Sequence, residues 1–347
     1  MTLNLAAEFA RRGHRVDLVL IDRTGPLLER IPAGIEVIGL GGARARHVVG
    51  SLRSYIRRKR PAALLSVAFQ TNILTMLAAL GLRRRPRIIL SVRNSYSATL
   101  AAGRRGTRFL FSLATRLLYP LADGVVGISH GCSDDVRRNA GLSPGQVVTI
   151  YNPVLDEDFD RRAAEPALPA DRKHDARALI VTVGRLAPQK DHATLLRAFA
   201  RVVRQRPARL LLIGEGELRS ELEALARALG IADHVEFAGL RDNPYPAMRE
   251  ADLFVLSSAW EGFGNVLVEA MAVGTPVVAT DCPDGPAEIL EGGKWGRLVP
   301  VGDADALAAA MLDVLEQGGI DARERARAFT VGRAASLYLD LLLSKER

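Results

Sequence analysis

The 347-residue sequence has few of the residues that mark disulfide-stapled or extracellular folds. Its 2 cysteines, Cys132 and Cys282, lie far apart in the chain and suit neither a zinc site nor a disulfide framework. So few cysteines fit a reducing compartment, and we expect a cytoplasmic protein. The first 15 residues also lack the unbroken apolar segment of a secretory signal, because Glu8, Arg11 and Arg12 interrupt it.

Long hydrophobic runs are scarce as well. Residues 61–82 form an uncharged stretch of 22 residues, close to the roughly 20 that a membrane span needs. We interpret it instead as a strand over 64–69, a polar turn over 70–72 and a helix over 73–82. A transmembrane segment is the less favoured alternative.

Acidic side chains are scarce in the first half of the chain. The whole sequence has 47 basic and 39 acidic residues and a net charge of +8, but residues 1–170 alone hold 25 basic and 13 acidic side chains. A basic half indicates nucleic acid, an anionic membrane surface or a phosphorylated substrate as partner. An arginine-rich composition without functional meaning is the alternative.

What the sequence does contain is ordinary globular composition, with 48% hydrophobic and 25% charged residues. Short apolar runs alternate with longer amphipathic stretches, which is typical of parallel sheets with crossover helices. We expect strands at 16–21, 35–40, 64–68, 88–92, 124–128, 147–150, 178–183, 209–213, 235–237, 253–257 and 275–279.

This rhythm predicts two doubly wound α/β domains. The first covers 1–152 and the second covers 178–328, joined by a proline-containing linker over 153–177. A final helix within 329–347 is expected to pack back on the first domain.

Two loops at the carboxyl ends of predicted strands are candidates for ligand binding. In the first, Gly184-Arg185-Leu186 is followed by Lys190 and Asp191, and Asp191 can cap the next helix. A lysine beside a helix N-terminus is disfavoured unless an anion accompanies it, so Arg185 and Lys190 indicate a phosphate. They fit two solvated surface cations equally well.

The second loop begins at Glu261. Its glycines allow backbone N–H groups to approach a ligand, and a helix should begin near Asn265 and contain Glu269. Both carboxylates can accept hydrogen bonds from sugar hydroxyls. Alternatively, Glu269 only complements the helix dipole and Glu261 is an exposed loop acid. Taken together, the two loops describe a pocket for a nucleoside diphosphate sugar.

The sequence resembles the retaining glycosyltransferases of family 4, whose GT-B fold has two Rossmann-like domains facing a central cleft. The resemblance covers nearly the whole chain. It rests on the two loops, with seven residues between Glu261 and Glu269, and on the segments 151–154 and 274–280. Segments 91–94 and 281–290 are similar to the branch that builds lipid-linked oligosaccharides, O-antigen or capsule.

The resemblance implies a hexosyltransferase that uses no cofactor and no metal. Arg185, Lys190 and Glu261 would be catalytic, with the two cations on the diphosphate and Glu261 on the donor sugar. Glu269 would hold the ribose, and the acceptor hydroxyl would attack the face from which the diphosphate leaves. The donor-binding residues would be Gly184, Gly262, Phe263, Gly264, Asn265, Val266 and Glu269. A UDP-sugar is the favoured donor.

The acceptors of this branch imply a membrane. A lipid-linked or cell-surface glycan acceptor would bring the basic first half to an anionic bilayer, with the protein peripheral on the inner face of the cytoplasmic membrane. Arginines 104, 105, 108 and 116 flank the apolar segments 109–111 and 117–119, which predicts an interfacial helix. Solvated helix ends are the alternative.

The sequence departs from the family at two places. Members commonly carry a histidine after the strand at 88–92, where this chain has Arg93 followed by Asn94, so we expect these two on the acceptor side. His130 falls elsewhere and is expected to be structural. The second departure is that Met1 lies within the first helix, so the central first strand is missing and about 15 to 20 residues are expected upstream.

Other functions fit the sequence less well. A non-catalytic or truncated relative that binds nucleotide sugars is the main alternative. A sugar-nucleotide epimerase or a phosphorylase would not require the two cations and two glutamates together. Nucleic-acid binding is not supported, because no recognised module accompanies the charge.

Overall fold

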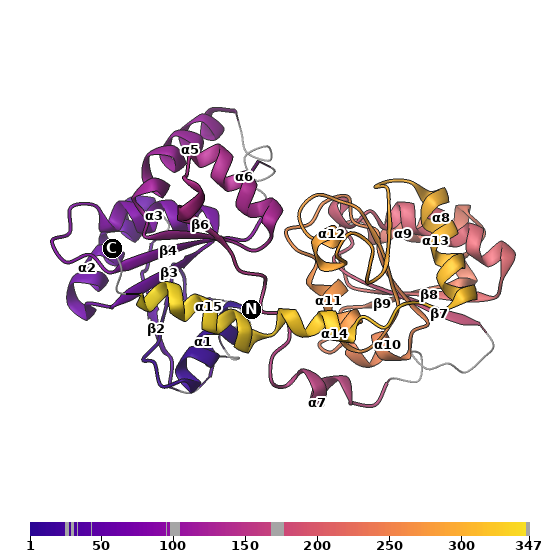
Figure 1. The fold of residues 1–347 in the computed structure, drawn as a ribbon. Helices are drawn as coiled ribbons and strands as arrows, with labels where there is room; N and C mark the ends of the chain where they lie inside the picture. Colours follow the sequence, from indigo (N-terminus) through magenta and orange to yellow (C-terminus); the bar gives the residue numbers. More distant parts are fainter. Residues whose placement is uncertain are drawn as a thin grey trace. The chain divides into compact units, whose positions relative to one another are not determined.

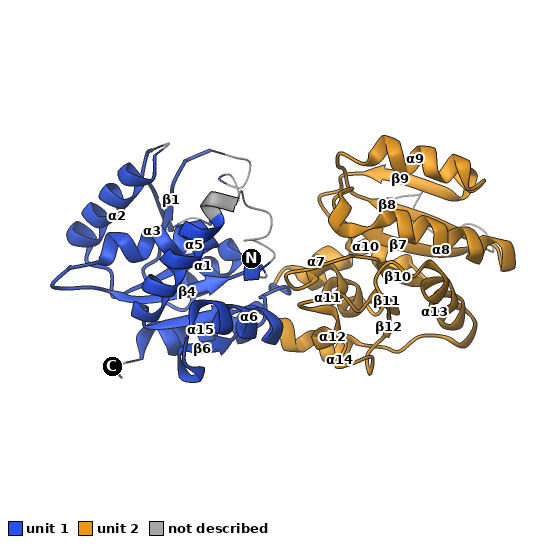
Figure 2. Ribbon diagram, turned by 90° about the horizontal axis from the view of Figure 1, so that it is seen from above, with its two compact units in different colours: residues 1–156, 330–347 blue, residues 157–329 orange. Residues whose placement is uncertain are grey.

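The computed structural model describes residues 1–24, 28, 31–32, 34–42, 44–94, 96–97, 105–167 and 177–344. The chain divides into two compact units (Figure 1, Figure 2). Unit 1 comprises Met1–Asp156 and Thr330–Arg347, and unit 2 comprises Glu157–Phe329. These boundaries lie a few residues from the 152 and 328 that the sequence indicates.

Unit 1 contains a four-stranded parallel sheet in the order β3-β4-β5-β6. Its strands are β3 (Ala63–Val67), β4 (Arg87–Val92), β5 (Gly124–Gly127) and β6 (Val147–Thr149). Its main helices are α1 (Thr2–Arg11), α2 (Ala45–Lys59), α3 (Phe69–Ala79), α5 (Arg105–Leu118), α6 (His130–Ala140) and α15 (Val331–Leu343).

Side chains of β4 alternate between two cores. Ile88 and Leu90 pack with residues of α3 and α6, whereas Ile89 packs with α1 and α15. Successive side chains of a strand point to opposite faces, so both faces of this sheet are buried under helices. This explains why the strand is apolar throughout.

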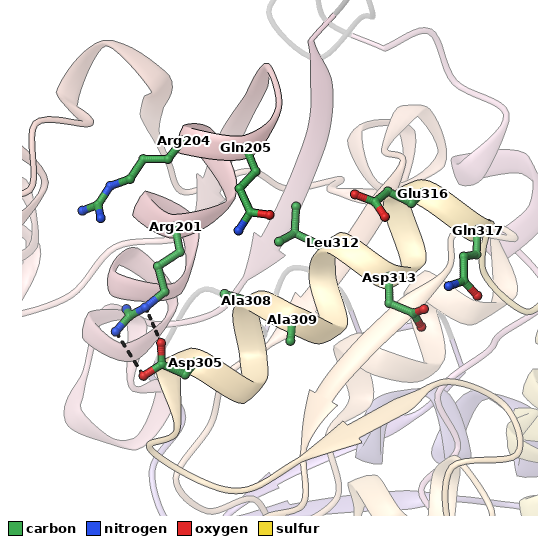
Figure 3. A pocket seen from close by; sticks show the side chains of 10 residues that line it. All are labelled: Arg201, Arg204, Gln205, Asp305, Ala308, Ala309, Leu312, Asp313, Glu316 and Gln317. Atoms are coloured by element: carbon green, nitrogen blue, oxygen red, sulfur yellow. Dashed lines mark hydrogen bonds and ion pairs between the residues drawn. The ribbon is translucent and has the colours of Figure 1, made fainter.

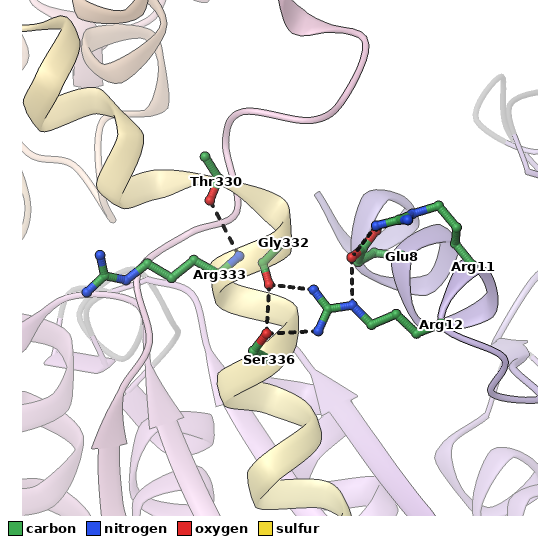
Figure 4. Close-up of polar contacts among 7 residues, drawn as sticks. All are labelled: Glu8, Arg11, Arg12, Thr330, Gly332, Arg333 and Ser336. Atoms are coloured by element: carbon green, nitrogen blue, oxygen red, sulfur yellow. Dashed lines mark hydrogen bonds and ion pairs between the residues drawn. The ribbon is translucent and has the colours of Figure 1, made fainter.

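Helix α15 returns to unit 1, where it contacts α1, β3 and β4. Arg12 fixes the two helices to each other: its Nη2 donates to the carbonyl of Gly332 and its Nη1 to the hydroxyl of Ser336, both at 2.8 Å (Figure 4). Glu8 accepts from Arg12 Nε at 2.7 Å and so orients the guanidinium. The C-terminal helix is therefore tied to α1 by polar as well as apolar contacts.

The sheet of unit 1 is interrupted. Strands β1 (Asp17–Leu20) and β2 (Glu36–Gly39) form a separate two-stranded parallel sheet. Among the described residues, neither strand pairs with the four-stranded sheet. A cavity of about 870 Å³ lies between β1 and β3 and is lined largely by apolar side chains, including Leu18 and Leu65. The interruption falls where the sequence predicts that the central first strand of the sheet is missing.

Unit 2 contains six parallel strands in the order β12-β11-β10-β7-β8-β9. They are β7 (Ala178–Val183), β8 (Ala208–Ile213), β9 (Val235–Gly239), β10 (Leu253–Leu256), β11 (Val277–Thr280) and β12 (Arg297–Val299). The helices are α7 (Phe159–Ala163), α8 (His192–Gln205), α9 (Arg219–Ala228), α10 (Tyr245–Glu250), α11 (Asn265–Ala272), α12 (Pro286–Ile289), α13 (Ala304–Gln317) and α14 (Arg323–Ala326). The predicted class of two doubly wound α/β domains is confirmed.

Three local expectations differ from the structure. Residues 70–72 are not a turn but lie in the first turn of α3, because the chain bends at Ala68, which has a φ of +81°, and the helix begins at Phe69. Strand β12 was not among the predicted strands. The segment after Asp156, expected as linker, contains α7, where Phe159 packs on Tyr245 with ring centroids 4.8 Å apart. Residues 168–176 of that linker lie outside the described residues.

The uncharged stretch 61–82 folds into β3 and α3 of unit 1, as the sequence favours. Across the described ranges, no helix combines the length and apolar content that a bilayer-crossing segment requires.

Candidate active site

The two predicted loops meet at the carboxyl edge of the unit 2 sheet. They follow β7 and β10, which are neighbouring parallel strands. Three hydrogen bonds join the loops: Ala259 N–H to the Gln189 carbonyl at 2.8 Å, Gln189 Nε2 to the Trp260 carbonyl at 3.0 Å, and Ser257 Oγ to the Lys190 carbonyl at 2.8 Å. The loops therefore form one continuous surface.

Lys190 and Glu261 form an ion pair at this junction. Lys190 Nζ lies 2.5 Å from Glu261 Oε1, and the Ser258 hydroxyl donates to the same oxygen at 2.7 Å. The side chains of Lys190 and Glu261 are 17% and 7% exposed, so the pair is largely shielded from solvent. Shielding strengthens the attraction between the charges and raises the cost of removing either partner.

The first loop is shaped by Asp191. This residue adopts a left-handed φ of +43° and caps α8, accepting from the backbone N–H of Thr194 at 3.2 Å and from its hydroxyl at 2.7 Å. The predicted cap is confirmed. The cap fixes where α8 begins and so fixes the backbone of Lys190 directly before it.

Arg185 lies on the exposed side of the same loop, while its neighbour Leu186 is only 1% exposed. The buried leucine anchors the loop, and the guanidinium of Arg185 projects into solvent. The two predicted cations thus occupy different environments, one shielded and paired, the other open.

Two glycines directly after β8 allow the backbone of that segment to pass close to the first loop. A Cβ at Gly214 would lie 2.0 Å from the Gly184 carbonyl oxygen, and a Cβ at Gly216 would lie 2.3 Å from that of Leu186. Gly214 also has a φ of +146°. Both positions therefore exclude a side chain. Neither glycine was predicted, although a Gly-x-Gly directly after a strand is a readable signal.

The second loop leads into α11. Gly264 precedes the helix with a left-handed φ of +98°, and the helix begins at Asn265, as predicted. Glu269 lies in the second turn of α11 and is half-buried, while Phe263 is buried against Phe329 with ring centroids 5.5 Å apart. Backbone N–H groups at the start of α11 favour an anion.

Two buried side chains beside the ion pair were not predicted. Burial, with a smaller contribution from the Lys190 charge, lowers the pKa of His192 from 6.5 to about 4. Burial, with a smaller contribution from Glu261, raises the pKa of the Cys282 thiol to about 12. Both groups are therefore neutral at pH 7, so neither adds a charge beside the ion pair.

The predicted acceptor-side residues follow β4 in unit 1. Asn94 is exposed, whereas Nε and Nη2 of Arg93 are buried and meet no hydrogen-bond partner within the part of the chain that the structure describes. Burial lowers the pKa of Arg93 below its ordinary value. His130 is exposed at the start of α6, with its Nδ1 at 3.3 Å from the Thr149 hydroxyl.

A further cavity of about 660 Å³ lies between α8 and α13, away from the predicted site residues (Figure 3). The ion pair of Arg201 with Asp305, at 2.5 Å, borders it. None of the predicted site residues lines this cavity. Among the described residues no group of three or more His, Cys, Asp or Glu side chains is placed to hold a metal ion.

Comparison with known proteins gives two family matches. A model described as "Glycosyltransferase Family 4" matches residues 1–158, and one described as "Glycosyl transferases group 1" matches residues 177–317. Together they span both units and include every predicted site residue.

Two curated relatives show how far the similarity extends. The N-acetylgalactosamine-N,N'-diacetylbacillosaminyl-diphospho-undecaprenol 4-alpha-N-acetylgalactosaminyltransferase of Campylobacter jejuni is 34% identical over 241 residues, covering 67% of this chain and 63% of that protein. The lipopolysaccharide core biosynthesis glycosyltransferase LpsE of Rhizobium meliloti is 36% identical over 174 residues, covering 48% of this chain and 50% of that protein. This chain thus matches between half and two thirds of their length.

Solved structures share the fold. A glycosyltransferase from Rickettsia africae has a TM-score of 0.83 at 16% identity, covering 99% of this chain and 94% of that one. HepE of Anabaena, solved with UDP-glucose, has a TM-score of 0.79 at 22% identity, covering 99% and 94%. These structures show that the chain has the GT-B fold. The two family models, which together span both units, show that it belongs to glycosyltransferase family 4.

Proposed function

We propose that the protein is a retaining glycosyltransferase that moves a hexose or N-acetylhexosamine from a UDP-sugar to a lipid-linked or cell-surface polysaccharide acceptor. The observation that carries this proposal is the junction of the two loops, where Lys190 meets Glu261 with Arg185 in the same loop as Lys190. The named activities of the relatives, one acting on a diphospho-undecaprenol-linked sugar, support the choice of acceptor.

The donor site follows from the chemistry of each group. Arg185 and Lys190 bind the diphosphate, assisted by backbone N–H groups at the start of α11. Glu269 accepts from the ribose hydroxyls and Glu261 from hydroxyls of the donor sugar. Lys190 is held by Glu261 in this structure, so its ammonium group contacts both this carboxylate and the bound diphosphate. Lys190 thereby links the group that binds the leaving diphosphate to the group that binds the sugar.

The reaction exchanges one bond for another at the anomeric carbon. The bond from that carbon to the β-phosphate oxygen breaks, and a bond to the acceptor oxygen forms on the same face. The electron pair of the broken bond stays on the nucleoside diphosphate, and the acceptor proton moves to a phosphate oxygen. Arg185 and Lys190 stabilise the charge that develops on the leaving group, so the proposed mechanism requires no metal.

On the acceptor side we assign an anionic group of the acceptor to Arg93, with Asn94 beside it. Two buried guanidinium nitrogens, Nε and Nη2, without a partner among the described residues are costly, and a phosphate would satisfy them. A diphosphate that carries the acceptor sugar on its lipid has this chemistry. Such acceptors are membrane-bound, so we place the reaction at the cytoplasmic face of the membrane.

The experiment that tests the proposed function measures binding and turnover with the full chain. A UDP-sugar at 100 times its dissociation constant should stabilise the folded state by about 2.7 kcal/mol, which raises the melting temperature. Acceptor-dependent release of UDP should then occur with the same UDP-sugar. Binding without turnover on any lipid-linked acceptor would favour a non-catalytic nucleotide-sugar-binding protein instead.

A further inference from the structure

The second loop carries one exposed aromatic side chain, Trp260, directly before Glu261. Trp260 is 46% exposed, whereas Glu261 is 7% exposed. The structure describes every residue from 250 to 280, and Trp260 is the only one of them that is exposed. The fold thus covers, wholly or in part, every neighbour along this segment and leaves one large apolar ring open to solvent beside the ion pair.

The backbone around this tryptophan is held from both sides. Its carbonyl accepts from Gln189 Nε2 at 3.0 Å, and the N–H of the preceding Ala259 donates to the Gln189 carbonyl at 2.8 Å. On the other side, the carboxylate of Glu261 is fixed by Lys190 and by Ser258. An indole has only two side-chain torsions, so a fixed backbone makes it a surface that costs little conformational entropy to bind.

The second tryptophan of the chain has quite different surroundings. Trp295 Nε1 donates to Glu291 Oε2 at 2.8 Å, and Lys294 Nζ lies over the ring, 4.9 Å from its centroid. Trp260 has neither kind of contact with the residues that the structure describes, since its Nε1 meets no acceptor and its ring meets no cation or other ring. The face and the N–H of Trp260 are therefore open to a ligand.

The neighbours of Trp260 favour a sugar as that ligand. A pyranose ring has C–H groups on its faces and hydroxyls at its edge, so it can stack on an aromatic ring while its hydroxyls bond to polar groups nearby. The next residue, Glu261, binds sugar hydroxyls in the proposed function. A nucleobase also stacks on indole. In the proposed function, however, the nucleoside belongs beside Glu269 in α11.

We propose that Trp260 is a stacking platform for the pyranose ring of a substrate. Its ring packs on the C–H face of the sugar, and its Nε1 donates to a hydroxyl at the edge of that sugar. This role rests on the proposed function and adds a contact to it. The sugar belongs either to the donor or to the acceptor, because both present the same chemistry.

Tryptophan fluorescence tests the stacking without turnover. In the variant Trp295→Phe, Trp260 is the only tryptophan of the chain, so tryptophan emission reports on its ring alone. UDP-glucose, UDP-galactose and their N-acetylated amino-sugar counterparts should shift the emission to shorter wavelength if the ring meets the donor sugar, because stacking removes water from the indole. A short-chain lipid-diphosphate-linked sugar, added to the UDP complex, should do so if the ring meets the acceptor sugar. UDP alone should cause no shift.

Substitutions separate stacking from support of the fold. Trp260→Ala should lower kcat/KM about tenfold by raising KM for the sugar that is stacked, whereas Trp260→Phe keeps a flat ring and should stay within about threefold of the wild type. Both variants should keep the wild-type melting temperature, because the changed side chain is exposed. Trp295→Phe is the matched control and should change kcat/KM by less than about twofold.

The outcomes separate this role from the proposed function. A shift with UDP alone as large as that with a UDP-sugar would overturn the proposal, because the ring would then stack on uracil. No shift with any UDP-sugar or acceptor, while UDP-sugars still raise the melting temperature of the wild type, would remove Trp260 from the site and leave the proposed function standing. If no UDP-sugar raises that melting temperature, both fail together.

Discussion

Lys190 Nζ lies 2.5 Å from Glu261 Oε1, and this ion pair joins the loop after β7 to the loop after β10. The pair is preformed and shielded, so in the proposed donor site the UDP-sugar would meet a lysine whose position is already fixed. The two residues are 71 positions apart in the chain, and adjacent parallel strands bring them together.

Replacement of Lys190 should affect stability and activity separately. Lys190→Ala leaves the buried Glu261 without its cation and should lower the free energy of unfolding by about 3 kcal/mol. Adding Glu261→Gln removes the stranded charge and should recover most of that stability without recovering transfer. Thermal unfolding and UDP release, measured on both variants, distinguish the two effects. Full recovery of turnover in the double variant would remove Lys190 from the mechanism.

Arg185 offers the complementary test, because its side chain is exposed. Arg185→Ala should change the free energy of unfolding by less than about 0.5 kcal/mol. Loss of a charge-assisted contact to the leaving diphosphate should lower kcat/KM at least tenfold. Steady-state kinetics of the variant measure this change. An unchanged kcat/KM would mean that Arg185 does not contact the diphosphate.

Ser258 is predicted to position Glu261. Its hydroxyl donates to Glu261 Oε1 at 2.7 Å, and its own carbonyl accepts from Thr280 Oγ1 at 2.6 Å. Ser258→Ala should cost about 1–3 kcal/mol of unfolding free energy, since a buried acceptor loses a partner. It should raise KM for the UDP-sugar, while Ser258→Thr should restore part of the affinity. A KM unaffected by Ser258→Ala would refute the positioning role.

His192 makes stability depend on pH. Its folded-state pKa of about 4 lies below the ordinary 6.5, so the unfolded chain binds more protons between these values. Its contribution to stability is complete above pH 6.5 and is lost as the pH falls towards 4, at up to about 1.4 kcal/mol per pH unit. Urea unfolding of wild type and His192→Asn across this range should show a shallower decline for the variant. Parallel declines would contradict this assignment.

Arg93 is predicted to discriminate between acceptors. Arg93→Gln should raise KM for a polyprenyl-diphosphate-linked sugar at least tenfold, because a charge-assisted contact to the diphosphate is lost. The KM for the UDP-sugar should stay within twofold. Arg58→Gln, which removes one exposed charge from α2 in the same unit, serves as control and should change neither value. An equal rise in the acceptor KM for both variants would mean that Arg93 acts only through its charge and does not bind the acceptor specifically.

Much of the fold and the donor loops is readable from the sequence. Apolar runs followed by glycine and charged residues locate the carboxyl ends of β7 and β10, and Asp191 marks the start of α8 by its capping chemistry. The gap between β1 and β3 follows from comparing the order of elements with a doubly wound sheet. Short segments of sequence specify these features by themselves, without information from tertiary contacts.

Other features depend on tertiary contacts. Ser258 looks like an ordinary loop serine until β10 and β11 place Thr280 and Glu261 around it. In α5 the composition indicates an interfacial helix, but only packing against Phe69 decides that Phe111 points inward and Phe109 outward. The depressed pKa of His192 likewise results from burial, which no sequence pattern specifies.

Sugar transfer from a UDP-sugar at the junction of Lys190 and Glu261 can be measured directly. The most direct measurement is the rate of UDP release by the full chain, with UDP-sugar and a polyprenyl-diphosphate-linked sugar, followed by NMR of the anomeric centre in the product. We predict acceptor-dependent release that Arg185→Ala slows at least tenfold, and a product with the anomeric configuration of the donor. Release that ignores the acceptor, or a product of inverted configuration, would contradict the account.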